Sequence, residues 1–170
     1  MKKPSVADGV DGEGWTKLSH GRGERPTLLS TCLAGRALVK IYSLRAGSKI
    51  PEDIAAIASR DKTRTALLSA IGGVSKVKIA YFNKRTKKYE EHDFDEELEV
   101  TSLIGNVTTK DGMPFVHVHG TFGRRDLSVL GGHVVSATVS PLLELVVTPT
   151  ANRALRRFDE GVGLNVIYST

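Results

Sequence analysis

The sequence has very little of several features that would define its class. Among 170 residues there is one cysteine, Cys32, so the chain cannot form an internal disulfide bond. No apolar run approaches the roughly 18 residues of a membrane-spanning helix, and the two N-terminal lysines precede no apolar stretch typical of a secretory signal. These absences predict a cytoplasmic protein with no membrane partner. Cys32 is expected to be a small apolar residue or, alternatively, a nucleophile.

Aromatic residues are also scarce, at 6% of the chain, although hydrophobic residues make up 40%. A chain of this length and composition can fill one core, which predicts one domain. Residues 1–30 are rich in Gly, Ser, Asp and Lys and contain the single tryptophan, Trp15. We therefore expect a flexible N-terminal tail at 1–30 and a folded domain at 31–170.

The charge of +5 is unevenly distributed along the chain. Residues 31–90 contain thirteen Lys and Arg against four Asp and Glu, whereas residues 91–170 contain six against eleven. Basic residues in such a cluster can follow the phosphates of DNA, but a solvated protein surface has the same composition. The candidates for nucleic-acid contact are Lys76, Lys78, Lys84, Arg85, Lys87 and Lys88.

Hydrophobic periodicity predicts one helix and many strands. Pro51 at a helix start, Glu52 and Asp53 in the first turn, and an apolar stripe of Ile54, Ile57 and Ala58 predict a helix that ends near residue 61. Strands are expected at 38–44, 63–73, 77–82, 89–94, 97–109, 114–122, 130–139, 142–149 and 164–169, with a hairpin turn at "KDG", 110–112. This pattern predicts an α+β fold, a mainly antiparallel β-sheet with one principal helix packed on it.

Three of the five histidines lie in "FVHVHGTFGRRDLSVLGGHVV", residues 115–135. His117 and His119 share one face of a strand because side chains alternate. A hairpin turn centred on residues 124–126 would place His133 opposite His117, since the numbers of paired residues would then add up to 250. Any other register with an even sum also keeps His133 on that face. Three neutral imidazoles suit zinc with one open coordination position, although histidines that bond strand neighbours are the alternative.

Two acidic residues are candidates for a supporting role. Glu144 stands alone in the apolar run "SPLLELVVTP", and a buried carboxylate there would need a partner. It is either an orienting or proton-transfer residue near a metal or a residue on an exposed strand face. Asp126 is a second proton-transfer candidate.

The segments "SAIGGVSKVKIAYFNKRTKKYEEHDF", "ELEVTSLIGNVTTKDGMPFVHVHGTFGRRDLSVLGGHVVSATVSPLLELVV" and "RRFDEGVGLNVI" together resemble the plants-and-prokaryotes conserved (PPC) domain. This resemblance implies an α+β domain that forms a homotrimer, with a divalent metal held by His117, His119 and His133. It also implies DNA binding, because plant relatives carry AT-hooks ahead of the domain and act in the nucleus.

The AT-hook itself is not intact in this chain. An AT-hook contains the sequence Arg-Gly-Arg-Pro, but residues 21–26 read "GRGERP", with Glu24 inserted between the glycine and the second arginine. The carboxylate of Glu24 opposes entry into the phosphate-lined groove of DNA. Two functions remain open. One is a trimeric metal-binding module with weak, non-specific DNA binding and a regulatory role. The other is a metal-dependent hydrolase or lyase.

Overall fold

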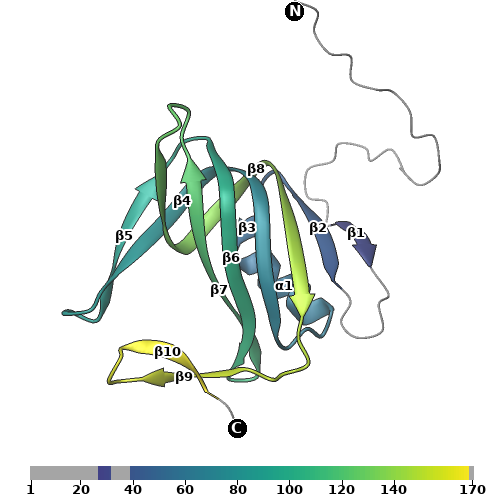
Figure 1. Ribbon diagram of the computed structural model, residues 1–170, viewed down its shortest axis with the longest axis vertical. Helices are drawn as coiled ribbons and strands as arrows, with labels where there is room; N and C mark the ends of the chain where they lie inside the picture. The colour runs from purple at the N-terminus through teal and green to yellow at the C-terminus, as the bar shows by residue number, and fades with distance from the viewer. Residues whose placement is uncertain (1–26, 32–38, 169–170) are drawn as a thin grey trace, which may run out of the picture.

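The computed structural model describes residues 27–31 and 39–168, and these contain ten strands and one helix. Trp15, the "GRGERP" segment and Cys32 lie outside the described residues. The elements, in chain order, are β1 (Thr27–Thr31), β2 (Lys40–Arg45), β3 (Lys49–Ile50), α1 (Glu52–Arg60), β4 (Ala66–Asn83), β5 (Lys88–Phe94), β6 (Leu98–Lys110), β7 (Met113–Gly123), β8 (Val129–Pro149), β9 (Leu155–Asp159) and β10 (Leu164–Tyr168) (Figure 1). The mostly antiparallel sheet with one short helix confirms the predicted α+β class.

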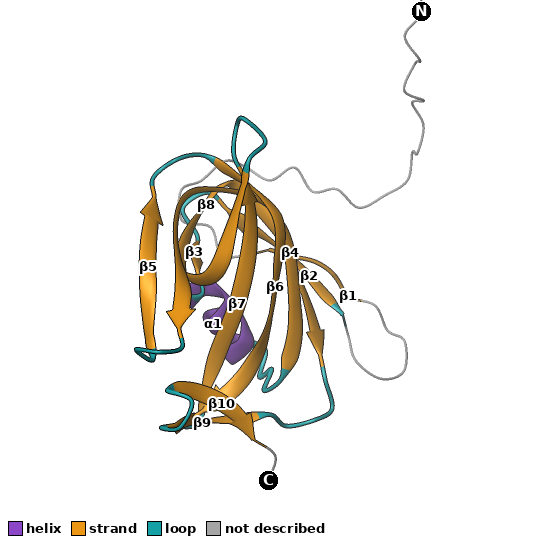
Figure 2. Ribbon diagram, turned by 60° about the vertical axis from the view of Figure 1, so that its left-hand side comes forward, coloured by secondary structure: helices purple, strands orange, loops and turns teal. Residues whose placement is uncertain are grey.

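Four long strands close on one another in a ring. β8 pairs with β4, β4 with β6, β6 with β7, and β7 again with β8, all antiparallel. Strands β2 and β3 extend the sheet along β8, β5 extends it along β4, and β9 follows β6. Strand β1 pairs with β2, so the sheet begins at residue 27, inside the segment that the sequence assigned to the tail. Figure 2 shows the resulting strong curvature.

Two of the strands are longer than the sequence predicted. Residues 63–73 and 77–82 were expected to form two strands, as were 130–139 and 142–149, but β4 and β8 each run through the expected break. At Gly72, φ is +140°, and a Cβ there would lie 2.3 Å from the carbonyl oxygen of Leu142. The glycine therefore lets β4 bend against β8 without ending, which is why the Gly-Gly pair is not a stop.

The helix α1 confirms the predicted apolar stripe. Ile54, Ile57 and Ala58 are buried, and α1 packs beside β7 and β3 within the curve of the sheet (Figure 2). Its end is fixed by Asp61, whose carboxylate accepts hydrogen bonds from Lys40 and Tyr42 on β2. With nine residues, α1 is too short to cross a bilayer, and the described part of the chain has no other helix.

The core lies inside the curved sheet. Alternate residues of β7 point into it, and Val118 and Phe122 are almost completely buried there. Tyr42, Leu103 and Leu143 join them from β2, β6 and β8. Since the even-numbered residues of β7 face inward, the histidines at 117 and 119 face the outer surface of the sheet.

Candidate metal centre

The hairpin of β7 and β8 brings the three predicted histidines together. Its five-residue loop, 124–128, is closed by a hydrogen bond from the backbone N–H of Arg124 to the carbonyl oxygen of Ser128. Within the loop Leu127 adopts φ +67°, and the Asp126 carboxylate accepts bonds from the backbone and hydroxyl of Ser128. The loop sets the register in which His119 pairs directly with His133.

The observed register of the β7–β8 hairpin differs from the prediction, because the partner of His133 is shifted by two residues along β7. The sequence placed the turn centre near residue 125 and His133 opposite His117, whereas the structure centres it on Asp126 and pairs His133 with His119. The register sum is still even, so all three histidines remain on one face. The prediction of a shared face is confirmed, and the prediction of the cross-strand partner was wrong because the loop is wider than expected.

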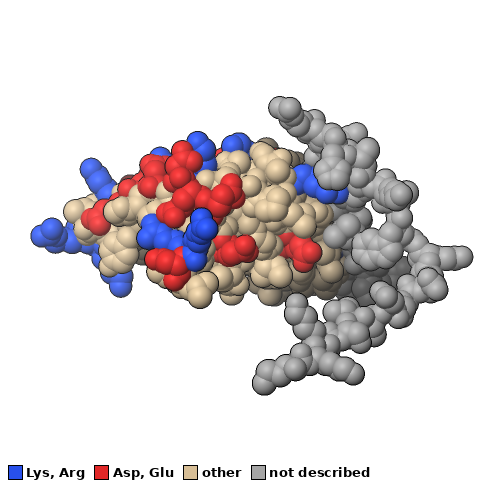
Figure 3. Space-filling model, turned by 90° about the horizontal axis from the view of Figure 1, so that it is seen from above, with Lys and Arg blue, Asp and Glu red and all other residues tan. Residues whose placement is uncertain are grey.

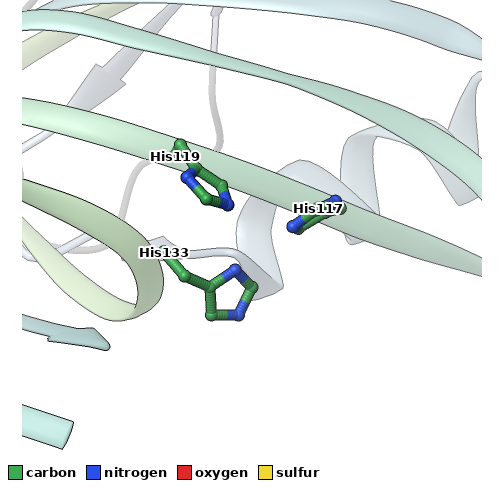
Figure 4. Close-up of side chains that lie close together, drawn as sticks. All are labelled: His117, His119 and His133. Atoms are coloured by element: carbon green, nitrogen blue, oxygen red, sulfur yellow. The ribbon is translucent and has the colours of Figure 1, made fainter. Parts of the chain in front are cut away.

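The three imidazoles form a compact cluster. One nitrogen from each ring lies within 4.8 Å of one nitrogen from each of the others. The ring centroids are 5.1 Å apart for His117 and His119, 5.1 Å for His117 and His133, and 5.4 Å for His119 and His133. Figure 4 shows the rings turned toward a common space. Zinc–nitrogen bonds of about 2.0–2.1 Å place two ligands on one ion within roughly 4.2 Å, so small side-chain movements suffice for shared coordination.

Backbone contacts explain the glycines beside His133. A Cβ on Gly131 would lie 2.7 Å from the carbonyl oxygen of Gly120, and one on Gly132 would lie 2.9 Å from that of Ala80. The glycines therefore allow β8 to lie tightly between β7 and β4. This close packing positions His133 on the cluster.

The surroundings of His117 and His133 favour the neutral form of the imidazole, which can donate a nitrogen lone pair to a metal. Burial, followed by the charges of His133, Arg156 and His119, lowers the pKa of His117 from 6.5 to about 4. Burial, followed by His119, also lowers the pKa of His133. Nδ1 of His133 is buried and has no hydrogen-bond partner among the described residues. A metal ion in the common space would satisfy this nitrogen, so the residues present fit the metal.

Two residues that the sequence did not identify as site residues contact the cluster. Tyr89 at the start of β5 stacks on His133, with centroids 4.7 Å apart and planes at 23°. Arg156 on β9 places Nη2 3.4 Å from Nδ1 of His117. The sequence does not distinguish Arg156 as a site residue, because its contact with His117 on β7 depends on a return of the chain across 39 residues.

These residues line a pocket of about 200 Å³ beside the cluster. It lies between β5, β7, β8 and the β9–β10 hairpin, and none of the described residues that line it has a carboxylate. The residues around it are Tyr89, Phe115, His117, His133, Arg156, Phe158, Gly163, Leu164 and Asn165. Two imidazoles and one guanidinium therefore face the same small space, together with aromatic and aliphatic side chains.

The two acidic candidates are not part of this pocket. Glu144 is exposed on β8, opposite Ser43 and Ile71, eleven residues beyond His133. Asp126 is exposed in the β7–β8 loop, and the four residue steps from Gly123 to His119 alone span about 13 Å of strand.

The basic residues divide into two groups. Lys76 pairs with Asp95 at 2.9 Å, and Lys78 lies 3.3 Å from Glu91, so acidic residues on β5 and directly after it pair with both lysines. The hairpin tip between β4 and β5 carries Lys84, Arg85, Lys87 and Lys88, which are exposed and make no ion pair with any described residue. Figure 3 shows basic side chains gathered at one end of the molecule and acidic ones beside them.

A curved antiparallel sheet that carries three outward-facing histidines and a single described helix defines an α+β domain with a candidate metal centre. The chain belongs to the Plants and Prokaryotes Conserved (PCC) domain family, whose model matches residues 34–151. This is the PPC resemblance noted in the sequence. No curated protein matches the chain.

Solved structures share this fold over most of the chain. A metal-containing protein from Archaeoglobus fulgidus is 33% identical, with a TM-score of 0.73, over 77% of this chain and 93% of that one. A candidate DNA-binding protein from Bacteroides thetaiotaomicron is 27% identical, with a TM-score of 0.76, over 85% and 98%. A plant- and prokaryote-conserved protein from Pyrococcus horikoshii is also 27% identical, with a TM-score of 0.73, over 89% and 99%.

Proposed function

We propose that this chain is a metal-binding PPC domain that works as a homotrimer and binds one divalent transition metal, zinc, per chain. The observation that carries the proposal is the cluster of His117, His119 and His133, with its nitrogens within 4.8 Å of one another. Three neutral imidazoles suit zinc better than magnesium or calcium, which prefer oxygen ligands. The likeness to a metal-containing protein of Archaeoglobus fulgidus supports metal binding by this domain.

The ligand set leaves room for an exchangeable partner. Structural zinc sites use four protein ligands, commonly including cysteine, whereas three histidines leave a coordination position for water or a small ligand. The pocket beside His117 and His133 provides access to that position. We therefore assign the centre to ligand binding rather than to holding the fold together.

An exposed apolar patch supports self-association. The patch consists of Leu67 and Ile71 on β4 and Ile104 on β6, which are 60%, 56% and 64% exposed. Ile104 pairs across the strands with His119, so the patch adjoins the most exposed histidine of the cluster. Contact between copies through this patch would remove apolar surface from water and cover His119.

DNA binding by this chain would depend on electrostatic attraction between basic side chains and DNA phosphates. Similarity to a candidate DNA-binding protein gives the idea its support, together with the basic tip of the β4–β5 hairpin. The four positive charges of residues 84–88 are followed by four negative charges in residues 90–95, on β5 and directly after it. A surface of this kind, with no base-reading element, supports weak and non-specific binding that could serve a regulatory role.

A metal-dependent hydrolase or lyase is the second candidate, and the open pocket favours it. A metal-bound water would need a proton acceptor nearby. Glu144 and Asp126 are the acidic candidates, but neither lines the pocket. This placement supports ligand binding over acid–base catalysis by a carboxylate.

Metal analysis of untagged protein tests the proposal most directly. Elemental analysis after dialysis against zinc should give one zinc per chain, and light scattering should give three times 18.4 kDa. Protein that retains no metal after loading with zinc or cobalt at neutral pH would contradict the metal assignment. A monomer mass would contradict the trimer.

A further inference from the structure

Arg156 is a buried cation on β9 that has no acidic partner among the described residues. Its side chain is anchored, because the residue is only 8% exposed and all three guanidinium nitrogens have partners. Nε donates to the Thr108 hydroxyl at 2.9 Å, and Nη1 donates to the Asn165 carbonyl at 2.6 Å. Nη2 donates to the Asn106 side-chain oxygen at 3.1 Å. These acceptors are neutral, so they fix the guanidinium in place without balancing its charge.

The contact from Arg156 and metal ligation are mutually exclusive uses of the His117 imidazole. Nη2 lies 3.4 Å from Nδ1 of His117 and can only donate. A neutral imidazole has one lone pair, and if the guanidinium uses it, none remains for a metal. When His117 is a metal ligand, Arg156 therefore loses this acceptor and keeps an uncommitted N–H donor at the pocket.

The size and lining of the pocket limit which ligand can replace Nδ1 of His117 as the acceptor for Arg156. Its volume of about 200 Å³ suits a small ligand. Arg156, His117 and His133 contribute polar groups to its lining. Phe115 and Leu164 contribute apolar groups, and the Arg156 guanidinium lies over the Phe115 ring, 5.1 Å from its centroid. The β4–β5 tip contacts the β9–β10 turn next to the lining residue Gly163, and Lys87 there donates from Nζ to the backbone oxygen of Glu160.

We propose that Arg156 and the three-histidine centre together bind a small monocarboxylate with a short apolar portion. The carboxylate receives the free guanidinium donor of Arg156, and the carbon chain lies against Phe115 and Leu164. The planar guanidinium of an arginine matches the planar geometry of a carboxylate better than the ammonium group of a lysine does, because the ammonium acts as a point charge. This inference rests on the proposed metal function and names the ligand class of that site.

Calorimetric titration of zinc-loaded, full-length protein with pyruvate tests the inference, with neutral pyruvamide as the matched ligand. Pyruvate should bind and pyruvamide should not. Arg156→Gln should weaken pyruvate binding at least tenfold, because a hydrogen bond to a charged group is lost. Arg157→Gln changes the exposed neighbour that stacks on Tyr168, and it should leave the affinity unchanged.

Zinc stoichiometry separates failure of the inference from failure of the metal function. Arg156→Gln should still bind one zinc per chain, and addition of pyruvate should change the visible spectrum of the cobalt-loaded wild type. If Arg156→Gln does not fold, Arg156→Lys keeps the charge without the forked geometry and should still weaken pyruvate binding severalfold. Equal pyruvate affinity in a folded Arg156 variant, or tighter binding of inorganic phosphate than pyruvate, would overturn the inference. Loss of zinc binding in the wild type would overturn the proposed function itself.

Discussion

His119 and His133 are a directly paired couple across the β7–β8 hairpin, with ring centroids 5.4 Å apart. Because the hairpin loop fixes this register, two of the three nitrogen donors are positioned by a single local structure. His117 adds the third donor two residues before His119 on the same strand face. The candidate ligands thus come from one continuous segment of 17 residues, and the rest of the fold buries and orients them.

His119→Ala should abolish stoichiometric zinc binding while the protein stays folded, since His119 is exposed and belongs to no core cluster. Elemental analysis after zinc loading measures the effect, and far-UV circular dichroism checks the fold. His92→Ala is the matched control, because His92 is exposed on β5 and lies outside the cluster. One zinc per chain in His119→Ala would argue against this ligand set.

Metal-free protein should lose stability as the pH falls from 6.5 toward 4. The folded pKa of His117 is lowered to about 4, mainly by burial, so the unfolded chain binds protons more readily in this window. The contribution of His117 to stability is therefore complete above pH 6.5 and is lost as pH falls through that range. Urea unfolding at several pH values measures this slope. His117→Asn should flatten it, and an unchanged slope would show that other groups cause it.

Ile104→Lys should convert the proposed trimer into monomers, because a charge in the apolar patch cannot be buried between copies without a partner. Light scattering should then return a mass near 18.4 kDa. Leu127→Lys is the control, since Leu127 is 86% exposed in the β7–β8 loop, away from the patch. If Leu127→Lys dissociates the assembly and Ile104→Lys does not, the interface lies elsewhere.

Changing Lys84, Arg85, Lys87 and Lys88 together to alanine should flatten the salt dependence of DNA binding. Each phosphate contact contributes about 0.9 to the slope of log affinity against log salt on duplex DNA. Fluorescence anisotropy over a range of salt concentrations measures this slope. Changing Lys76 and Lys78, which already pair with acidic residues, should alter it much less. Tight sequence-specific binding that survives the quadruple change would locate the DNA surface elsewhere.

Asp61→Asn should lower the free energy of unfolding by roughly 1–3 kcal/mol, since it leaves the donors of Lys40 and Tyr42 without a charged acceptor. Burial opposes ionisation of Asp61, but hydrogen bonds from Lys40, Tyr42 and Arg60 outweigh it and lower the pKa to about 2. This contribution is present above pH 3.8 and is lost as pH falls through 2.

Urea unfolding at neutral pH compares this change with Asp95→Asn, whose pair with Lys76 is exposed on both sides and should contribute at most about 1 kcal/mol. A smaller loss for Asp61→Asn than for Asp95→Asn would show that the β2–α1 contact does not stabilise the fold.

Local chemistry in the sequence was enough to predict several elements. The stripe of Ile54, Ile57 and Ala58 predicted the helix, and "KDG" predicted the turn at which Asp111 and Gly112 adopt positive φ. The i, i+2 spacing of His117 and His119 predicted a shared face. Each of these depends on backbone period or on one residue's dihedral preference, which neighbours along the chain determine.

The tertiary structure decided the features that depend on distant segments. Whether Gly72 ends a strand or bends it depends on the backbone of Leu142, seventy residues later. The pairing of His133 with His119 depends on how many residues the loop accommodates, which alternation alone leaves open. Arg156 reaches His117 only because β9 returns beside β6, and long-range contacts of this kind leave no periodic trace in sequence. The sequence by itself therefore determined the candidate ligands, and only the folded chain brought a buried cation and a pocket to them.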